Sequence, residues 1–263
     1  MKLNAIAAAL VLAATGSAHA AMDNSLSGNG SLILGLIDPV ANVSAIFDLG
    51  VSMDAFLPGN APAYQAWNLN AANYGSAWAD FTAAADMSNA QFMVFAMDST
   101  GNAINSDRYL STTNADMTNN NNKPSITNFL NFIGVDGLVN AANDQGTHTT
   151  EQDGANFVND PQSTAFLAAS KGFKNGKWNT DKSPFVAWAP VASDLSFYML
   201  TNSSASGLSK AGVTAYADTF ALDYANGSLA YGVQAPIPEP ETYALMLAGL
   251  GLVGFMARRR KAA

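Results

Sequence analysis

Short runs in which apolar and polar residues alternate predict several β-strands in this chain. Residues 31–37 are apolar on both faces, as expected of a well-buried strand. Residues 43–49 follow the Asp38-Pro39 turn signal and alternate apolar with polar positions, which predicts a second strand with one buried face. We expect these two strands to form a hairpin or a sheet corner, with further short strands at 91–97 and 195–200.

The dipeptide Asn226-Gly227 predicts a β-hairpin near residue 230. It is the preferred pair for a two-residue type I′ turn, which places large residues of both flanking segments on one face. This loop implies three cross-strand pairs: Tyr224 with Leu229, Leu222 with Tyr231, and Phe220 with Val233.

Helices are a minority in the predicted fold. Helical spacing and end signals predict short helices at 125–134, at 160–169 and, more weakly, at 76–85. Residues 102–124 and 143–160 lack a core pattern and are expected to be polar loops.

The predicted fold class is therefore α+β, mainly β: an antiparallel β-rich domain with a few short helices. One domain is favoured, and a split into two domains within residues 114–123 is the alternative.

The N-terminus has the three parts of a secretory signal peptide. Lys2 supplies the positive charge, residues 5–14 form a short apolar stretch, and Ala18 and Ala20 provide the small residues of a cleavage site. We expect signal peptidase to cut after Ala20, so that the mature chain begins at Ala21.

The C-terminus combines three further elements. A proline-rich segment containing Pro238, Glu239 and Pro240 precedes an apolar run from Tyr243 to Ala257. A basic stop follows immediately, formed by Arg258, Arg259, Arg260 and Lys261. As a helix the run spans about 22 Å, less than the roughly 30 Å hydrocarbon core of a bilayer. The basic residues favour the cytoplasmic side, so we expect transient anchoring with the rest of the chain outside the inner membrane.

This three-part tail resembles the C-terminal sorting signal of PEP-CTERM proteins. The resemblance covers residues 236–263 only and says nothing about the fold of the remainder. It implies an exosortase, a membrane-embedded enzyme that acts at the tail, as a processing partner. It also implies delivery to the cell envelope, a biofilm or an extracellular polysaccharide matrix. The expected organisation is a signal peptide at 1–20, a β-rich extracytoplasmic domain at 21–235 and the sorting signal, with its transmembrane helix, at 236–263.

Composition narrows the chemistry of the domain at 21–235. The chain is acidic, with 12 basic and 20 acidic residues and a formal net charge of -8, so binding to nucleic acid is not expected. It contains no cysteine, which excludes disulfides, thiol nucleophiles and thiolate metal sites. His148 is the only histidine left after removal of the leader, and it lies in a polar segment. The sequence has no G-x-S-x-G motif of the kind that carries a nucleophilic serine. We therefore assign no catalytic residue, no metal ligand and no cofactor.

Carboxylates leave two weaker options open. Asp144, Glu151, Asp153 and Asp160 are close in sequence and could coordinate calcium, with a solvated acidic loop as the simpler interpretation. A pair of aspartates could support glycoside hydrolysis, although no spacing singles out a pair.

Four aromatic residues lie close together between residues 58 and 80: Tyr64, Trp67, Tyr74 and Trp78. Aromatic rings beside Asn and Asp can stack on the apolar face of a sugar, so Trp67 and Trp78 are candidate sugar contacts. Packing in the hydrophobic core is the alternative for both.

Taken together, these features predict a non-enzymatic cell-surface or matrix protein with extracellular polysaccharide as a candidate partner. It would be held at the inner membrane with its body in the periplasm, and then processed and released to the surface. A secreted glycan-acting hydrolase or carbohydrate-binding protein is the alternative, and a permanently anchored periplasmic protein is a third interpretation.

Overall fold

The computed structural model describes residues 21–101, 103–127, 136–145, 154–169, 189–191 and 193–234. The chain divides into two units, Met1–Gly232 and Val233–Ala263, so no unit boundary falls within residues 114–123. The predicted signal peptide and sorting tail lie outside the described residues.

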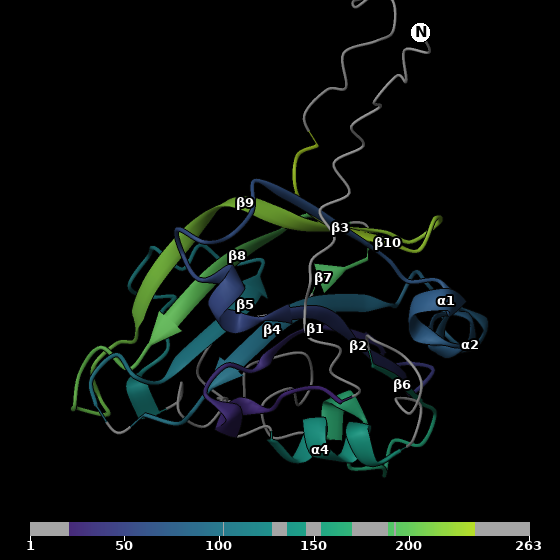
Figure 1. The fold of residues 1–263 in the computed structure, drawn as a ribbon, viewed down its shortest axis with the longest axis horizontal. Helices are drawn as coiled ribbons and strands as arrows, with labels where there is room; N and C mark the ends of the chain where they lie inside the picture. The colour runs from purple at the N-terminus through teal and green to yellow at the C-terminus, as the bar shows by residue number, and fades with distance from the viewer. Residues whose placement is uncertain are drawn as a thin grey trace, which may run out of the picture. The chain divides into compact units, whose positions relative to one another are not determined.

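The first unit is mainly β (Figure 1). Its strands are β1 Ser31–Asp38, β2 Val43–Ser52, β3 Tyr64–Asn68, β4 Gln91–Asp98, β5 Arg108–Thr113, β6 Ala155–Val158, β7 Ala189–Pro190, β8 Leu195–Thr201, β9 Gly212–Asp223 and β10 Ser228–Gly232. Its α-helices are α1 Ala71–Tyr74, α2 Ala77–Ala84 and α4 Asp136–Asp144. Its 3-10 helices are η1 Ser25–Ser27, η2 Met53–Phe56 and η3 Leu167–Ala169.

All the strands join one curled sheet in the order β3-β10-β9-β8-β5-β4-β1-β2-β6, with β7 paired to β4. Every pairing is antiparallel. The prediction of an antiparallel β-rich fold with a few short helices is therefore confirmed.

Both faces of the central sheet are buried, and β1 shows how they divide. Leu32, Leu34 and Leu36 enter a core that includes side chains of α1 and α2. Ile33 and Ile37 enter a second core that includes side chains of α4 and η3. Successive strand residues point to opposite faces, so helices on both sides leave no polar face here.

The β1–β2 hairpin is confirmed, but the expectation of one buried face on β2 was wrong. Residues 43–49 are all buried, including the polar Ser44 and Asp48. The Ser44 hydroxyl accepts a hydrogen bond from the Leu167 backbone, and Asp48 accepts one from the Ser31 hydroxyl. Polar side chains with partners can be buried, and alternation alone does not reveal such partners.

Both predicted polar loops contain strands. Residues 102–124 include β5, which lies between β4 and β8 in the sheet, and residues 143–160 include the outer strand β6. Ser111, Thr112 and Thr113 of β5 are fully buried. Because β5 pairs with a strand on each side, the backbone of these residues is hydrogen-bonded within the sheet. A polar sequence can therefore occupy the middle of a sheet.

The β9–β10 hairpin is confirmed with a different loop and register. The loop has four residues, 224–227, and β9 pairs with β10 through Leu222–Leu229 and Phe220–Tyr231. A type I′ turn requires positive φ at both central residues, whereas in this loop only Gly227 has it, at 59°. The register differs from the prediction by two residues, which preserves the buried face because the strand period is two.

The helix predictions had mixed outcomes. Helix α2 confirms the prediction at 76–85. Residues 161–166 form turns that lead into η3, so the helix predicted from residue 160 was wrong. The helix predicted at 125–134 lies largely outside the described residues, and Ser125 itself bridges to Lys210.

Candidate functional site

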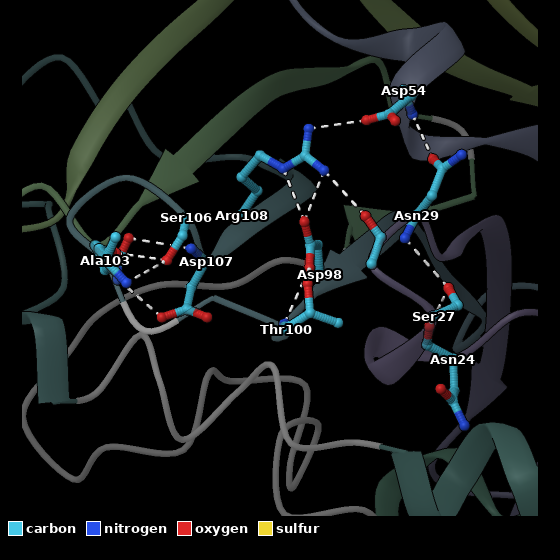
Figure 2. A network of polar contacts seen from close by, with 12 residues as sticks. Asn24, Ser27, Asn29, Asp54, Asp98, Thr100, Ala103, Ser106, Asp107 and Arg108 are labelled. Atoms are coloured by element: carbon cyan, nitrogen blue, oxygen red, sulfur yellow. Dashed lines mark hydrogen bonds and ion pairs between the residues drawn. The ribbon is translucent and has the colours of Figure 1, made fainter.

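A network of polar contacts surrounds Arg108, the first residue of β5 (Figure 2). The antiparallel register places Arg108 opposite Asp98 at the end of β4. Its Nε and Nη2 groups donate to Asp98 Oδ2 at 3.0 and 2.6 Å, and Nη1 donates to Asp54 Oδ1 at 2.8 Å. Nη2 also donates to the Gly28 backbone oxygen at 3.0 Å. One guanidinium therefore joins the N-terminal segment, η2, β4 and β5.

The environment of Arg108 keeps it charged. Burial acts to lower its pKa, but the hydrogen bonds and charges of Asp98 and Asp54 outweigh burial and raise the pKa above its ordinary value. Asp98, only 4% exposed, is also held by Thr100, whose backbone N–H and hydroxyl both donate to Asp98 Oδ1. This ion pair is part of the folded framework because both partners are fixed by the β4–β5 ladder.

A second buried carboxylate, Asp107, lies beside the Arg108 network. The Asn202 side chain donates to Asp107 Oδ2 at 2.8 Å and accepts from the Asp107 backbone N–H at 3.1 Å. Burial raises the pKa of Asp107, the charge of Asp98 raises it further, and a hydrogen bond from the Gly101 backbone acts in the opposite direction. A carboxyl with a raised pKa next to a second carboxylate is the feature expected of a general acid.

Two adjoining surface hollows lie near this network, of about 540 and 270 Å³. Both are lined by Pro58, and together their linings include every residue of β9 from 212 to 218. We call them together the β9 trough. Arg108 lines the larger hollow, whereas Asp107 lines neither, so the carboxyl with the raised pKa is not part of the β9 trough.

The two tryptophans predicted to contact sugar occupy different environments. Trp67 is 9% exposed, packs against Phe56 and Phe220, and donates from Nε1 to the Leu49 backbone oxygen at 2.8 Å. Its position matches the core alternative, and its ring offers no open face to a sugar. Trp78 is half-buried on α2 and packs against Phe47 and Tyr224.

Most other predicted site residues lie outside the described residues. They are the cleavage-site residues Ala18 and Ala20, His148, Glu151, Asp153 and the whole tail, including Pro238, Glu239, Pro240, Tyr243, Ala257, Arg258, Arg259, Arg260 and Lys261. Of the acidic loop, Asp144 and Asp160 are described, and both are exposed. Within the described ranges no group of three or more His, Cys, Asp or Glu side chains could hold a metal ion. None of the helices in those ranges has the length and apolar character that a membrane crossing requires.

Comparison with known protein families identifies a motif in the C-terminal tail. The model of the PEP-CTERM protein-sorting motif matches residues 236–261. The chain carries a PEP-CTERM sorting motif. The motif identifies an exported protein that exosortase processes at the membrane. Comparisons with curated proteins and with solved structures found no match to the chain.

Outside the PEP-CTERM motif, the sequence analysis overlooked Arg108. It is the only arginine of the chain before residue 258, in a region whose other basic residues are lysines. Arginine forms multidentate contacts with carboxylates that lysine cannot form. A single arginine among lysines could therefore have pointed to an ion-pair network in the fold.

Proposed function

We propose that residues 21–235 form a non-enzymatic interaction domain of the cell surface or extracellular matrix. The leader is removed by signal peptidase, the tail holds the domain at the inner membrane with its body in the periplasm, and exosortase processing then releases it outward. Extracellular polysaccharide is the proposed partner. The PEP-CTERM motif supports the export and processing steps.

The observation that carries the non-enzymatic proposal is the structural use of the buried carboxylates. Asp38 accepts from the backbone N–H groups of Val40, Ala41 and Asp86. Asp48 accepts from Ser31 and Gly50, and Asp98 and Asp107 have the partners given above. Carboxylates that accept backbone N–H groups at strand ends and turns stabilise the fold, and their lone pairs are then engaged.

A glycan-acting hydrolase is the second candidate, because the pKa of Asp107 is raised beside Asp98. This reading requires substrate to reach Asp107, which lines neither hollow. The non-enzymatic reading is therefore the better supported one.

Intact mass spectrometry of the protein from separated fractions of its native host tests the route. A C-terminus near residues 238–241 in outer or released fractions supports it. A product that ends at Ala263 and stays in the inner membrane would contradict it and favour a permanent anchor.

Incubation of the purified mature protein with polysaccharides tests the absence of enzymatic activity. We expect no release of reducing ends. Release that Asp107→Asn abolishes would establish the hydrolase instead.

A further inference from the structure

The β9 trough has the dimensions of a site for a polymer. Its linings follow seven consecutive residues of β9, 212–218, on one side and residues 57–59 and 61–63 on the other. Seven strand residues extend over roughly 23 Å. That length exceeds what a single small molecule needs and suits a linear chain.

The β5–β8–β9 ladder aligns side chains across the larger hollow. Arg108 pairs with Thr201 and Thr201 with Gly212, while Met199 pairs with Thr214 in the neighbouring row. All five residues line the hollow, together with Asn105 and Ser203. Hydroxyl and amide groups that both donate and accept therefore alternate with the apolar surface of Met199.

The aromatic core ends in the smaller hollow. Tyr216 lines it, with its ring centroid 4.7 Å from that of Phe197 and its hydroxyl bonded to the Phe56 backbone oxygen. These contacts with Phe197 and Phe56 fix the position of the Tyr216 ring. The ring in the smaller hollow and the hydroxyl groups in the larger one together match the apolar and polar faces of a sugar chain.

The charges of the trough disfavour an anionic ligand. Its charged lining residues are Arg108 and Asp218. Arg108 already faces Asp54 at 2.8 Å and Asp98 at 2.6 Å, so these four groups carry more negative than positive charge. An anionic polymer would be repelled, whereas a neutral one would not.

An extended peptide fits the trough less well. A peptide that adds to a sheet needs a continuous row of backbone donors and acceptors. The wall opposite β9 contains Pro58 and Pro62, which have no backbone N–H. Short hydroxyl and amide side chains recognise a sugar chain without such a row.

We propose that the β9 trough binds a linear, neutral polysaccharide. This inference rests on the proposed interaction role of the domain and gives that role a site and a ligand class.

Affinity electrophoresis of the mature protein in gels that contain dextran or a linear β-glucan tests the proposal, with alginate as the anionic probe. We expect retardation by at least one neutral glucan and none by alginate. The double variant Thr201→Val/Thr214→Val should weaken retardation at least tenfold, and Ala63→Trp should abolish it, because Ala63 is exposed and lines the smaller hollow from the wall opposite β9.

Thr219→Val and Ala66→Trp are the matched controls, because both residues are exposed on strands of the same sheet and line neither hollow. Unchanged melting temperatures establish that all variants fold. Retardation by no neutral glucan, by alginate alone, or equally in trough and control variants would overturn the proposal. Saturable binding of extended peptides that the trough variants abolish would overturn it in favour of a peptide site.

Cleavage of the glucan by a protein that still binds it would overturn the non-enzymatic role and leave the site assignment intact. The two proposals can therefore fail separately.

Discussion

The side chain of Asn143 holds the backbone of Met22 from both directions. Met22 N–H donates to Asn143 Oδ1 at 3.0 Å, and Asn143 Nδ2 donates to the Met22 carbonyl at 2.9 Å. The Met22 side chain is 3% exposed in the core beneath α4. The segment that follows the predicted leader is thus an integral part of the fold, fastened across 121 positions of sequence.

Asn143→Ala should therefore destabilise the protein by about 1–2 kcal/mol, since two backbone groups lose their partner near a buried residue. Denaturant unfolding followed by tryptophan fluorescence measures this loss. Asn140→Ala is the control: Asn140 is exposed and accepts a hydrogen bond from the Asn24 side chain, and its replacement should cost less than about 0.5 kcal/mol. Equal losses in the two variants would contradict the fastening of Met22 by Asn143.

Arg108→Met should destabilise the protein by about 3 kcal/mol, because it leaves the buried Asp98 carboxylate without its counter-charge. The double variant Arg108→Met/Asp98→Asn should recover part of that loss, with a coupling energy above about 1 kcal/mol. Lys210→Met removes an exposed cation that bonds only a backbone carbonyl among the described residues, and should be nearly neutral. Additive losses at Arg108 and Asp98 would show that the pair is not coupled.

Three exposed aspartates should make stability sensitive to acid. Hydrogen bonds from Ser88, Thr118 and Asn226 side chains are the main causes that lower the pKa of Asp86, Asp116 and Asp223, respectively. Their stabilising contribution is complete above the unfolded pKa of about 4 and is lost as the pH falls through the lower folded values. Unfolding free energy measured between pH 7 and pH 2 should therefore fall below about pH 4. The triple variant Asp86→Asn/Asp116→Asn/Asp223→Asn should show a smaller fall.

Asp107 should act in the opposite sense. Its folded pKa is raised by burial, so the folded state binds the proton more readily than the unfolded chain, and protonation stabilises the fold. The contribution of Asp107 to stability rises as the pH falls from above its folded pKa to about 4. The free energy of unfolding of the Asp107→Asn variant, relative to that of the unmodified protein, should therefore be higher at pH 7 than at pH 4. Identical differences at the two pH values would contradict the raised pKa.

Gly227→Ala should be more harmful than Gly59→Ala, although both glycines have positive φ. A Cβ at Gly227 would meet Trp78 Nε1 at 2.9 Å, whereas one at Gly59 would meet nothing within 4 Å. We expect a loss of about 1 kcal/mol at Gly59 from backbone strain alone and roughly twice that at Gly227. Thermal unfolding measures both, and equal losses would show that Trp78 does not pack on the β9–β10 loop.

The β9–β10 hairpin shows how far the sequence pattern could lead. The buried face of Phe220, Leu222, Leu229 and Tyr231 was predicted correctly. The loop was not, because Asp223 accepts from the Asn226 backbone N–H and side chain and stabilises a four-residue turn. The dipeptide preference describes an isolated turn, and a neighbouring side chain changed the choice.

The candidate site depended on tertiary structure to a greater extent than the β9–β10 hairpin did. Trp67 has the residue type of a sugar contact, but the pairing of β3 with β10 turns it into the core. Thr201 and Thr214 are ordinary polar residues in the sequence, and only the register of β8 and β9 brings them to one trough. Which polar residues face the same space is set by strand pairing and is invisible to local pattern.

By itself, the sequence determined that the protein carries a sorting motif for export. The PEP-CTERM motif at 236–261 is a short continuous segment, so residue order alone was enough to recognise it. The strands β1, β2, β4 and β8 were likewise predicted from local composition and pattern, because apolar β-forming runs are a local property of the sequence. The tertiary structure decided the sheet order, the burial of the polar strand β5, the Arg108 network and the β9 trough. These depend on contacts between residues far apart in the chain, whose free energy no local segment contains.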